Sequence, residues 1–300
     1  MGATAAATPE AADAHAMLFA APHGTPYPGI DNRVHEATGH AVRASFGAEA
    51  HWVDHWNYDV GGTLLGDGGF RLADLGDLAT SPDDGPGNRA LIEDLTRRIL
   101  ARGAVPLMLG GDDSVPIPFL AGFASAGPIT ILQVDAHIDW REHRRGEPLG
   151  DSSTIRRASE LAHVERIVQV GMRGFGSARR EEVEAAASWG AEIVTAYDVH
   201  RDGIGAALMH VPDGARVVIT FDCDALDPSA MPAVMAPTPG GLTYAQALGL
   251  IRGVAERAVI AGFDLIEFVP GRDPDGSAAT TAASLVSAVI GTLAGRPGEG

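Results

Sequence analysis

Two apolar runs in this chain each lead into potential metal ligands that stand two positions apart. The runs are residues 129–132 and 217–220. The ligands that follow them are Asp135, His137, Asp139, Asp222 and Asp224. Because side chains alternate between the two faces of a strand, we expect each set to emerge together, with Cys223 turned into the core. Apolar runs of this kind are typical of buried parallel strands, whose carboxyl ends carry functional residues.

A third apolar run, residues 107–109, leads into two glycines and then Asp112 and Asp113. Three strand ends are therefore expected to point at one place. The four carboxylates of the first two clusters would repel one another if they converged without a compensating charge. Neither cluster contains an Arg or a Lys that could supply this charge. Hard divalent cations suit a set of ligands that is rich in oxygen. The sequence predicts a metal site at these strand ends.

Strand-like runs alternate with helical patterns along most of the chain. The strands are expected at residues 105–109, 129–134, 166–171, 193–196, 217–221 and 259–268. The helices are expected at residues 88–102, 177–189, 243–257 and 278–293. Such alternation favours an α/β fold with a mostly parallel sheet wrapped by helices. The length of 300 residues suits one domain, which we assign to residues 16–295 after a flexible tail at 1–15.

Charge and composition exclude several classes of protein. The net charge of −17 disfavours nucleic-acid binding, which requires a basic surface, and favours attraction of a cationic substrate. All 22 basic residues are Arg, so chemistry that depends on Lys is excluded. No basic residue precedes Arg33 and no run approaches transmembrane length, so we expect no membrane association and a cytoplasmic location. The single cysteine, Cys223, is expected to be a core residue rather than a nucleophile.

Five segments of the chain resemble the signatures of the ureohydrolases, the arginase and agmatinase family, and they occur in the same order. They are residues 110–114, 135–139, 220–228, 238–242 and 264–270, within a similarity that spans residues 17–293. The resemblance implies a three-layer α/β/α sandwich, two Mn²⁺ ions per chain and a homo-oligomer, either a trimer or a hexamer. It also implies hydrolysis of a small cationic guanidino substrate to urea and an amine, as an agmatinase-like enzyme or a guanidino-acid ureohydrolase.

The resemblance also implies roles for individual residues. Asp135 and Asp222 would bridge the two metal ions, which lower the pKa of a water molecule. The remaining ligands would be Asp113 and Asp139 for one ion, and His137 and Asp224 for the other. Glu267, in an apolar run, would hold the substrate guanidinium, because a buried carboxylate requires a partner. The alternative for Glu267 is a structural salt bridge, for example with Arg272.

Two departures from the family pattern affect the expected site. Asp113 stands where the family usually has a histidine ligand, and Asp112 is the alternative residue there, either as a ligand or as a structural acceptor. The histidine that shuttles protons in many members is missing from residues 150–158. Proton transfer would then fall to Asp151, to His143 or to water. Otherwise the chain is a catalytically impaired homologue that acts as a partner subunit.

The loop at residues 140–147 is expected to contact the tail of the substrate, but its sequence does not determine which guanidino compound is the substrate. Its arginines, Arg144 among them, suit the carboxylate of a guanidino acid such as 4-guanidinobutyrate. They are equally typical of a solvated surface, and the two glutamates of the same loop suit an amine tail such as that of agmatine. A zinc deacetylase of arginase-like architecture is a remote alternative, because the chain contains no His-His pair.

Overall fold

The computed structural model describes residues 2–176 and 178–295, and its centre is one parallel β-sheet. Its strands are β1 (Thr4–Ala5), β2 (Ala16–Ala21), β3 (Leu72–Asp77), β4 (Val105–Gly110), β5 (Ile129–Val134), β6 (Val164–Met172), β7 (Glu192–Thr195), β8 (Arg216–Asp222) and β9 (Val259–Ile266). Their order across the sheet is β1-β3-β2-β4-β9-β8-β5-β6-β7. The central strands β4, β9, β8 and β5 are almost wholly buried, which explains why their sequences are apolar on both faces.

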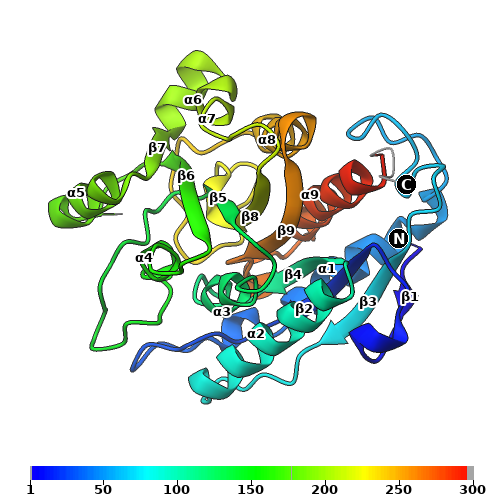
Figure 1. Ribbon diagram of the computed structural model, residues 1–300, viewed down its shortest axis with the longest axis horizontal. Coiled ribbons are helices and arrows are strands. Elements are labelled where there is room, and N and C mark those ends of the chain that lie inside the picture. The colour runs from blue at the N-terminus through cyan, green and yellow to red at the C-terminus, as the bar shows by residue number, and fades with distance from the viewer. Residues whose placement is uncertain (1, 177, 296–300) are drawn as a thin grey trace.

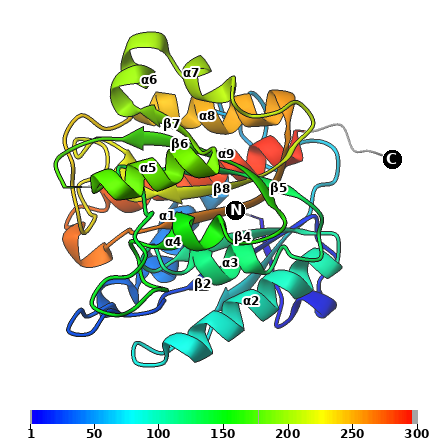
Figure 2. The ribbon, with the colours of Figure 1, turned by 60° about the vertical axis from the view of Figure 1, so that its left-hand side comes forward.

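Helices cover both faces of the sheet. They are α1 (Thr38–Ala48), α2 (Gly85–Ala101), α3 (Pro116–Ala121), α4 (Thr154–Ala158), α5 (Arg180–Trp189), α6 (Ala196–Asp202), α7 (Gly205–Leu208), α8 (Tyr244–Arg257) and α9 (Ser277–Ala294). One core cluster contains side chains of α1, α6, α8 and α9, and a second contains side chains of α2, α3, α4 and α5. Figures 1 and 2 show α8 and α9 on one side of the sheet and α2 and α3 on the other. The predicted three-layer α/β/α sandwich is confirmed.

Local sequence signals explain where several helices begin and end. Asp84 caps α2 by accepting a hydrogen bond from the backbone N–H of Gly87 at 2.9 Å. Thr243 and Gln246 form a capping box at the start of α8. Helix α5 begins at Arg180, later than expected, and ends at Trp189, where the following Gly190 adopts a left-handed conformation. Residue 177, the first of the expected helix, lies outside the described residues.

The N-terminal segment differs from the flexible tail expected at residues 1–15. Thr4 and Ala5 form the edge strand β1, which pairs in parallel with β3, and residues 9–11 form a 3₁₀ turn. Strands β2 and β3 and helix α1 are also absent from the elements expected from sequence. The sheet therefore extends further toward the N-terminus than the apolar patterns indicated. Met1 lies outside the described residues.

Helix α9 is long and apolar enough to span a membrane by length and composition alone, contrary to the expectation that no run approaches that length. However, 61% of its residues are buried inside the protein. It packs against α1 and α8 and contributes Leu285, Val286 and Val289 to the core. This pattern is that of the core helix of a globular protein.

Asp264 is a carboxylic acid in the middle of the core. It lies on β9, is fully buried, and accepts a hydrogen bond from Thr220 Oγ1 at 2.8 Å. Its second oxygen, Oδ2, has no hydrogen-bond partner among the described residues. Burial raises the pKa of Asp264 to about 8, because the charged form would lose its hydration without a compensating partner. The folded protein therefore holds this carboxyl neutral near pH 7.

Asp264→Asn should make the protein more stable relative to the parent as the pH rises. The unfolded chain ionises Asp264 above about pH 4, whereas the folded protein ionises it near pH 8. The contribution of Asp264 to stability is thus complete below pH 4 and is lost as pH rises to 8, by about 1.4 kcal/mol per pH unit at most. Thermal unfolding at pH 5, 6.5 and 8 tests this, with the exposed Asp67→Asn as control. A difference in Tm that is constant over this range contradicts the prediction.

Candidate active site

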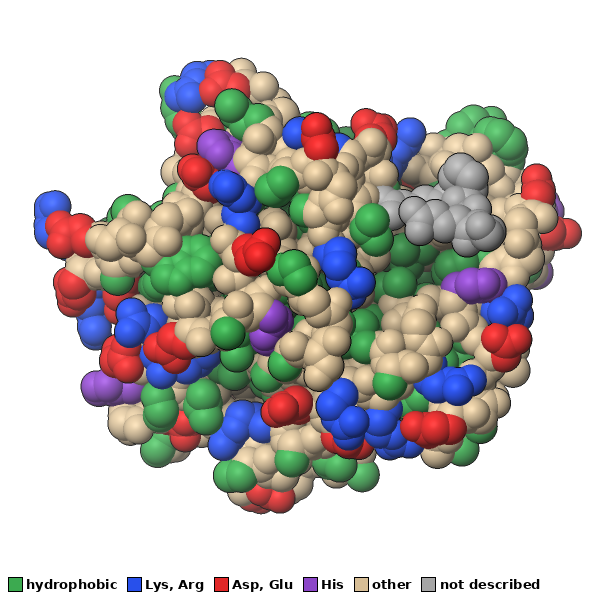
Figure 3. Space-filling view, viewed as in Figure 1, with side chains coloured by type: hydrophobic (Ala, Val, Ile, Leu, Met, Phe, Trp, Pro, Cys, Tyr) green, Lys and Arg blue, Asp and Glu red, His purple; other side chains and the backbone are tan. Residues whose placement is uncertain are grey.

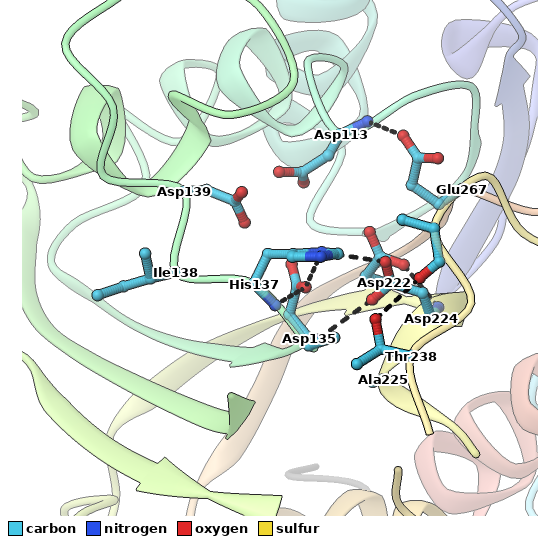
Figure 4. A network of polar contacts seen from close by, with 12 residues as sticks. Asp113, Asp135, His137, Ile138, Asp139, Asp222, Asp224, Ala225, Thr238 and Glu267 are labelled. Carbon is cyan, nitrogen blue, oxygen red and sulfur yellow. Dashed lines mark hydrogen bonds and ion pairs between the residues drawn. The ribbon is translucent and has the colours of Figure 1, made fainter. Parts of the chain in front are cut away.

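The expected site residues gather where the central strands end. Residues that follow β4, β5, β8 and β9 line one cavity of about 300 Å³ at the carboxyl edge of the sheet. Figure 4 shows their acidic side chains and one imidazole facing a common space. Open α/β sheets place ligand sites at this edge, because the loops that leave parallel strands converge there.

The Asp135–Asp139 segment is a loop rather than the strand end expected from its spacing. Strand β5 ends at Val134, and Asp139 has a φ of 50°, which residues other than glycine rarely adopt. The alternation of faces nevertheless holds, because His137 and Asp139 line the cavity, whereas Ala136 and Ile138 are buried away from it. The expectation was thus wrong about the conformation and right about which side chains pack inward.

The second cluster begins on a strand and continues in a turn. Asp222 is the last residue of β8 and caps a 3₁₀ turn, Cys223–Ala225, by accepting the N–H of Asp224 at 2.6 Å. Cys223 is fully buried, as predicted. The turn places the Asp224 carboxylate 3.1 Å from Nδ1 of His137, which comes from the other cluster.

The structure brings five of the six expected metal ligands into two overlapping groups. In each group, one potential ligand atom per residue lies within 4.8 Å of the others. The groups are Asp135, His137 and Asp224, and Asp113, Asp135 and Asp222. Asp135 belongs to both groups, whereas Asp222 belongs to one. Asp139 lines the same cavity but belongs to neither group.

The electrostatics of these groups fit bound cations. Burial, together with neighbouring carboxylates, raises the pKa values of Asp113, Asp139 and Asp222 well above their usual range. Burial lowers the pKa of His137, but its bonds to Asp135 and Asp224 outweigh burial and raise it to about 12. Oδ2 of Asp113 is buried, and no described residue forms a hydrogen bond with it. This oxygen-rich set with one imidazole suits two hard divalent cations.

Asp112 and Asp113 have different surroundings. The Asp112 carboxylate accepts the backbone N–H of Ser114 at 3.1 Å and its hydroxyl at 2.5 Å, which is the structural role considered for it. The Asp113 side chain instead joins Asp135 and Asp222. The geometry therefore places Asp113 where the sequence pattern puts the first ligand.

Glu267 lies beside the acidic groups in a strained backbone conformation. It follows β9 with a φ of 63°, held by a hydrogen bond from its own N–H to the carbonyl of Gly111 at 2.9 Å. Its Oε1 accepts the N–H of Asp113 at 2.9 Å. Arg272 does not pair with it in the structure and donates to the carbonyl of Val234. Within residues 2–176 and 178–295, Glu267 therefore has no salt bridge to an arginine.

His35 is a residue of the cavity that no motif in the sequence indicates. It is buried, lines the cavity, and its Nε2 lies 3.9 Å from Oε2 of Glu267. Burial lowers its pKa, so it faces Glu267 as a neutral imidazole. Its Nδ1 lies 3.1 Å from the carbonyl of Phe268. His35 stands alone in a weakly patterned region, and only a spacing motif of the kind seen in residues 135–139 could have singled it out.

Asn32 is a second lining residue that the sequence did not indicate. Its side chain is buried, yet in the part of the chain that the structure describes neither its oxygen nor its nitrogen has a hydrogen-bond partner. A buried amide without partners is costly, so this side chain is suited to a ligand or a water molecule in the cavity. No motif surrounds Asn32 in the sequence.

The two candidates for proton transfer lie in different places. Asp151 lines the cavity, and burial raises its pKa to about 6, with a further contribution from Asp112. His143 is exposed and lines a separate hollow together with Trp140 and Glu182. The structure therefore separates His143 from the cavity that holds the expected ligands.

Arg144 belongs to the rim of the same cavity. Its guanidinium lies over the ring of Tyr27, 5.1 Å from the ring centroid, and 3.8 Å from Oδ1 of Asp151. Neighbouring Arg141 is engaged with Glu182 at 3.2 Å. Elsewhere on the surface, acidic and basic side chains are mixed over the face shown in Figure 3. Arg144 is thus a cation at the entrance that is only loosely paired.

Comparisons with known proteins agree with this geometry. The chain is 33% identical over 232 residues to the guanidinobutyrase of Pseudomonas aeruginosa, a match that covers 75% of this chain and 72% of that protein. It is 32% identical over 255 residues to the mitochondrial agmatinase of Gallus gallus, covering 83% and 74%. The fold matches proclavaminate amidino hydrolase from Streptomyces clavuligerus with a TM-score of 0.81 at 24% identity, covering 97% and 95%. A model of the arginase family matches residues 36–291, and the chain belongs to that family.

Proposed function

We propose that this protein is a hydrolase that converts a guanidino compound to urea and an amine in a metal-dependent reaction. The observation that carries the proposal is the position of Glu267 beside two groups of metal ligands, as a buried carboxylate that no arginine of the described residues pairs with. A guanidinium would satisfy the charge of Glu267, and its carbon would lie next to the metal groups. The activities named for the relatives are of this kind.

The metal ligands would be Asp113, Asp135, His137, Asp139, Asp222 and Asp224. Asp135, which belongs to both groups, is the best placed to contact two ions. We propose Mn²⁺, because carboxylates predominate and one imidazole completes the set. When bound, two such ions supply Lewis acidity that activates water and stabilises the charge that develops on the guanidinium carbon's substituents.

Glu267 would bind and orient the guanidinium. A carboxylate accepts several hydrogen bonds, so the bond from the N–H of Asp113 leaves capacity for a bidentate, charge-assisted pair. The neutral His35 beside Oε2 does not compete for this charge. Fixing the plane of the guanidinium also fixes the face that water attacks.

The substrate tail would extend past Asp151 toward Arg144. Arg144 is loosely paired and lines the cavity, so it favours a tail that carries a carboxylate. The amide of Asn32, which has no partner, is a further donor for such a group. We therefore propose a guanidino acid such as 4-guanidinobutyrate in preference to agmatine. Comparing kcat/KM for these two compounds tests the assignment, and a preference for agmatine contradicts it.

Removing metal should abolish urea formation reversibly. Protein dialysed against a chelator lacks the cations that activate water, so urea release should fall to background and return when Mn²⁺ is added. Colorimetric urea assay over a panel of guanidino compounds provides the measurement. A protein that binds Mn²⁺ but forms no urea from any of them is instead the impaired homologue considered above.

Asp151→Asn should lower kcat and remove an ionisation near pH 6. The Asp151 carboxylate, with its pKa of about 6, is the base form above that pH, and the amide cannot accept a proton. We expect a loss of roughly 10²-fold in kcat, the usual contribution of a general base. The measurement is kcat from pH 5 to 9, with Asp151→His as the variant that restores a proton carrier. His143→Asn should leave the profile unchanged, and the reverse result would assign the proton to His143.

The expected cytoplasmic location and homo-oligomeric assembly stay predictions of the sequence. Size-exclusion chromatography with light scattering tests the assembly.

A further inference from the structure

Two glutamines interrupt the apolar core directly beneath the metal ligands. Gln133 on β5 and Gln169 on β6 are paired neighbours in the sheet, and both are buried. Buried amides are costly unless their hydrogen bonds are satisfied. From Ile167 onward, the other residues of β6 are apolar or glycine, and Thr130 is the other polar residue of β5. The two glutamines therefore require partners within the protein.

Each glutamine uses all of its hydrogen-bonding groups. Nε2 of Gln133 donates to Oδ2 of Asp135 at 2.8 Å and to Oδ2 of Asp139 at 2.6 Å. Nε2 of Gln169 donates to Oε1 of Gln133 and to the carbonyl of Ile138 at 2.8 Å. Oε1 of Gln169 accepts the indole N–H of Trp140 at 2.9 Å. We call Gln133, Gln169 and Trp140 the glutamine relay.

The direction of the relay is determined by its two ends. The indole N–H of Trp140 only donates, the carbonyl of Ile138 only accepts, and Asp135 and Asp139 only accept when they are ionised as metal ligands. If either side-chain amide rotated by 180°, its oxygen and nitrogen would change places. A hydrogen bond would then be lost, and two donors or two acceptors would face each other. The relay therefore has one arrangement, and bonds aligned in one direction strengthen one another in a dry core.

All four groups that the two glutamines reach outside their own pair lie between residues 135 and 140, which we call the ligand loop. The relay thus fastens this loop to the sheet at Asp135, Ile138, Asp139 and Trp140. Asp139 has a positive φ, a conformation that costs about 1 kcal/mol or more for a residue other than glycine. Bonds at Ile138, Asp139 and Trp140 hold the loop in it.

We propose that Gln133 and Gln169 are positioning residues that preset the Asp135 and Asp139 carboxylates for divalent cations. This inference rests on the metal site of the proposed function. Without the relay, two buried carboxylates of like charge would move apart, and binding a cation would first require bringing them together. Because the relay already holds both carboxylates close together in the folded protein, cation binding does not have to supply the free energy for bringing them together.

The test is titration of Mn²⁺ into metal-free protein by calorimetry. Gln133→Leu keeps the size of the side chain but removes the donor shared by Asp135 and Asp139, and it should raise the Kd for Mn²⁺ by roughly 10–100-fold. Gln169→Leu should raise it by a smaller factor. Thr220→Val is the matched control, because Thr220 is a buried polar residue on neighbouring β8 that bonds Asp264 outside the relay. Its Kd should equal that of the parent.

A second readout separates positioning from general stability. A purely structural role predicts a lower Tm without metal and an unchanged Kd, and that result for Gln133→Leu overturns the proposal. Should Gln133→Leu not fold, Trp140→Phe removes only the terminal donor and should still raise the Kd. An unchanged Kd in both Trp140→Phe and Gln169→Leu overturns the proposal as well. If the parent protein binds no Mn²⁺, the proposed metal site itself is wrong. If the parent binds Mn²⁺ and the variants have the same Kd, only the positioning role of the glutamines is wrong.

Discussion

Glu267→Gln should nearly abolish urea formation without harming the fold. Glutamine still accepts the N–H of Asp113, but it lacks the charge that pairs with a guanidinium. Loss of one partner of a buried, charge-assisted pair costs about 3–4 kcal/mol, so kcat/KM should fall roughly 10²–10³-fold. Because burial raises the pKa of Glu267, removing its charge should leave Tm unchanged or slightly higher. Urea assays, unfolding curves and metal analysis provide the measurements.

The matched control for this variant is Glu256→Gln, which makes the same change at an exposed position on α8. It should keep the parent's kcat/KM. If Glu267→Gln retains activity close to that of the parent, another group binds the guanidinium, and neighbouring His35 becomes the first residue to test. A large fall in Tm or in metal content would instead assign Glu267 a structural role.

Asp135→Ala should remove both metal ions and with them all urea formation. Asp135 is the one residue common to the two ligand groups found among residues 2–176 and 178–295, so its loss weakens both sites. Asp113→Ala removes a member of one group and should lose one ion preferentially. Elemental analysis after dialysis counts the ions per chain.

Asp67→Ala, at an exposed position outside the cavity, is the control and should keep both ions. Two ions retained by Asp135→Ala would show that Asp135 does not bridge them. Asp222 would then be the alternative bridge, although it belongs to one group. Equal metal loss in Asp113→Ala and Asp135→Ala would mean that the two sites fill cooperatively.

The sequence predicted the central strands well because burial on both faces leaves a strong local signal. Runs such as those of β5 and β8 are mostly apolar, and the predicted strands at 129–134 and 217–221 lie within one residue of the observed limits. Strand β2 has no such signal, because three of its six residues are alanine, which has low strand propensity. Its pairing with β3 and β4 supplies the stabilisation that its own residues do not.

The sequence predicted those residues of the site that stand close together in one motif. Spacing was sufficient to group Asp135 with His137, whereas Asp222 and Asp224, which are equally close in sequence, lie in different ligand groups. It was not sufficient for His35 and Asn32, which reach the cavity through a loop that only the folded protein places there. The structure also separates His143 from Asp151, although both follow the same ligand loop. Their positions depend on the path of residues 141–153, for which the sequence carries no periodic signal.

The strand order has a consequence for how the chain is made. Strand β9 is the last strand in the sequence, yet it lies between β4 and β8 and joins strands β1 to β4 with strands β5 to β8. During synthesis, both β4 and β8 emerge with an open edge that stays unpaired until β9 has left the ribosome. Open edges of apolar parallel strands promote association between chains. A nascent chain that has not yet reached residue 259 would therefore expose two unpaired, aggregation-prone strand edges. Its solubility in the cell would depend on chaperones until β9 pairs with β4 and β8.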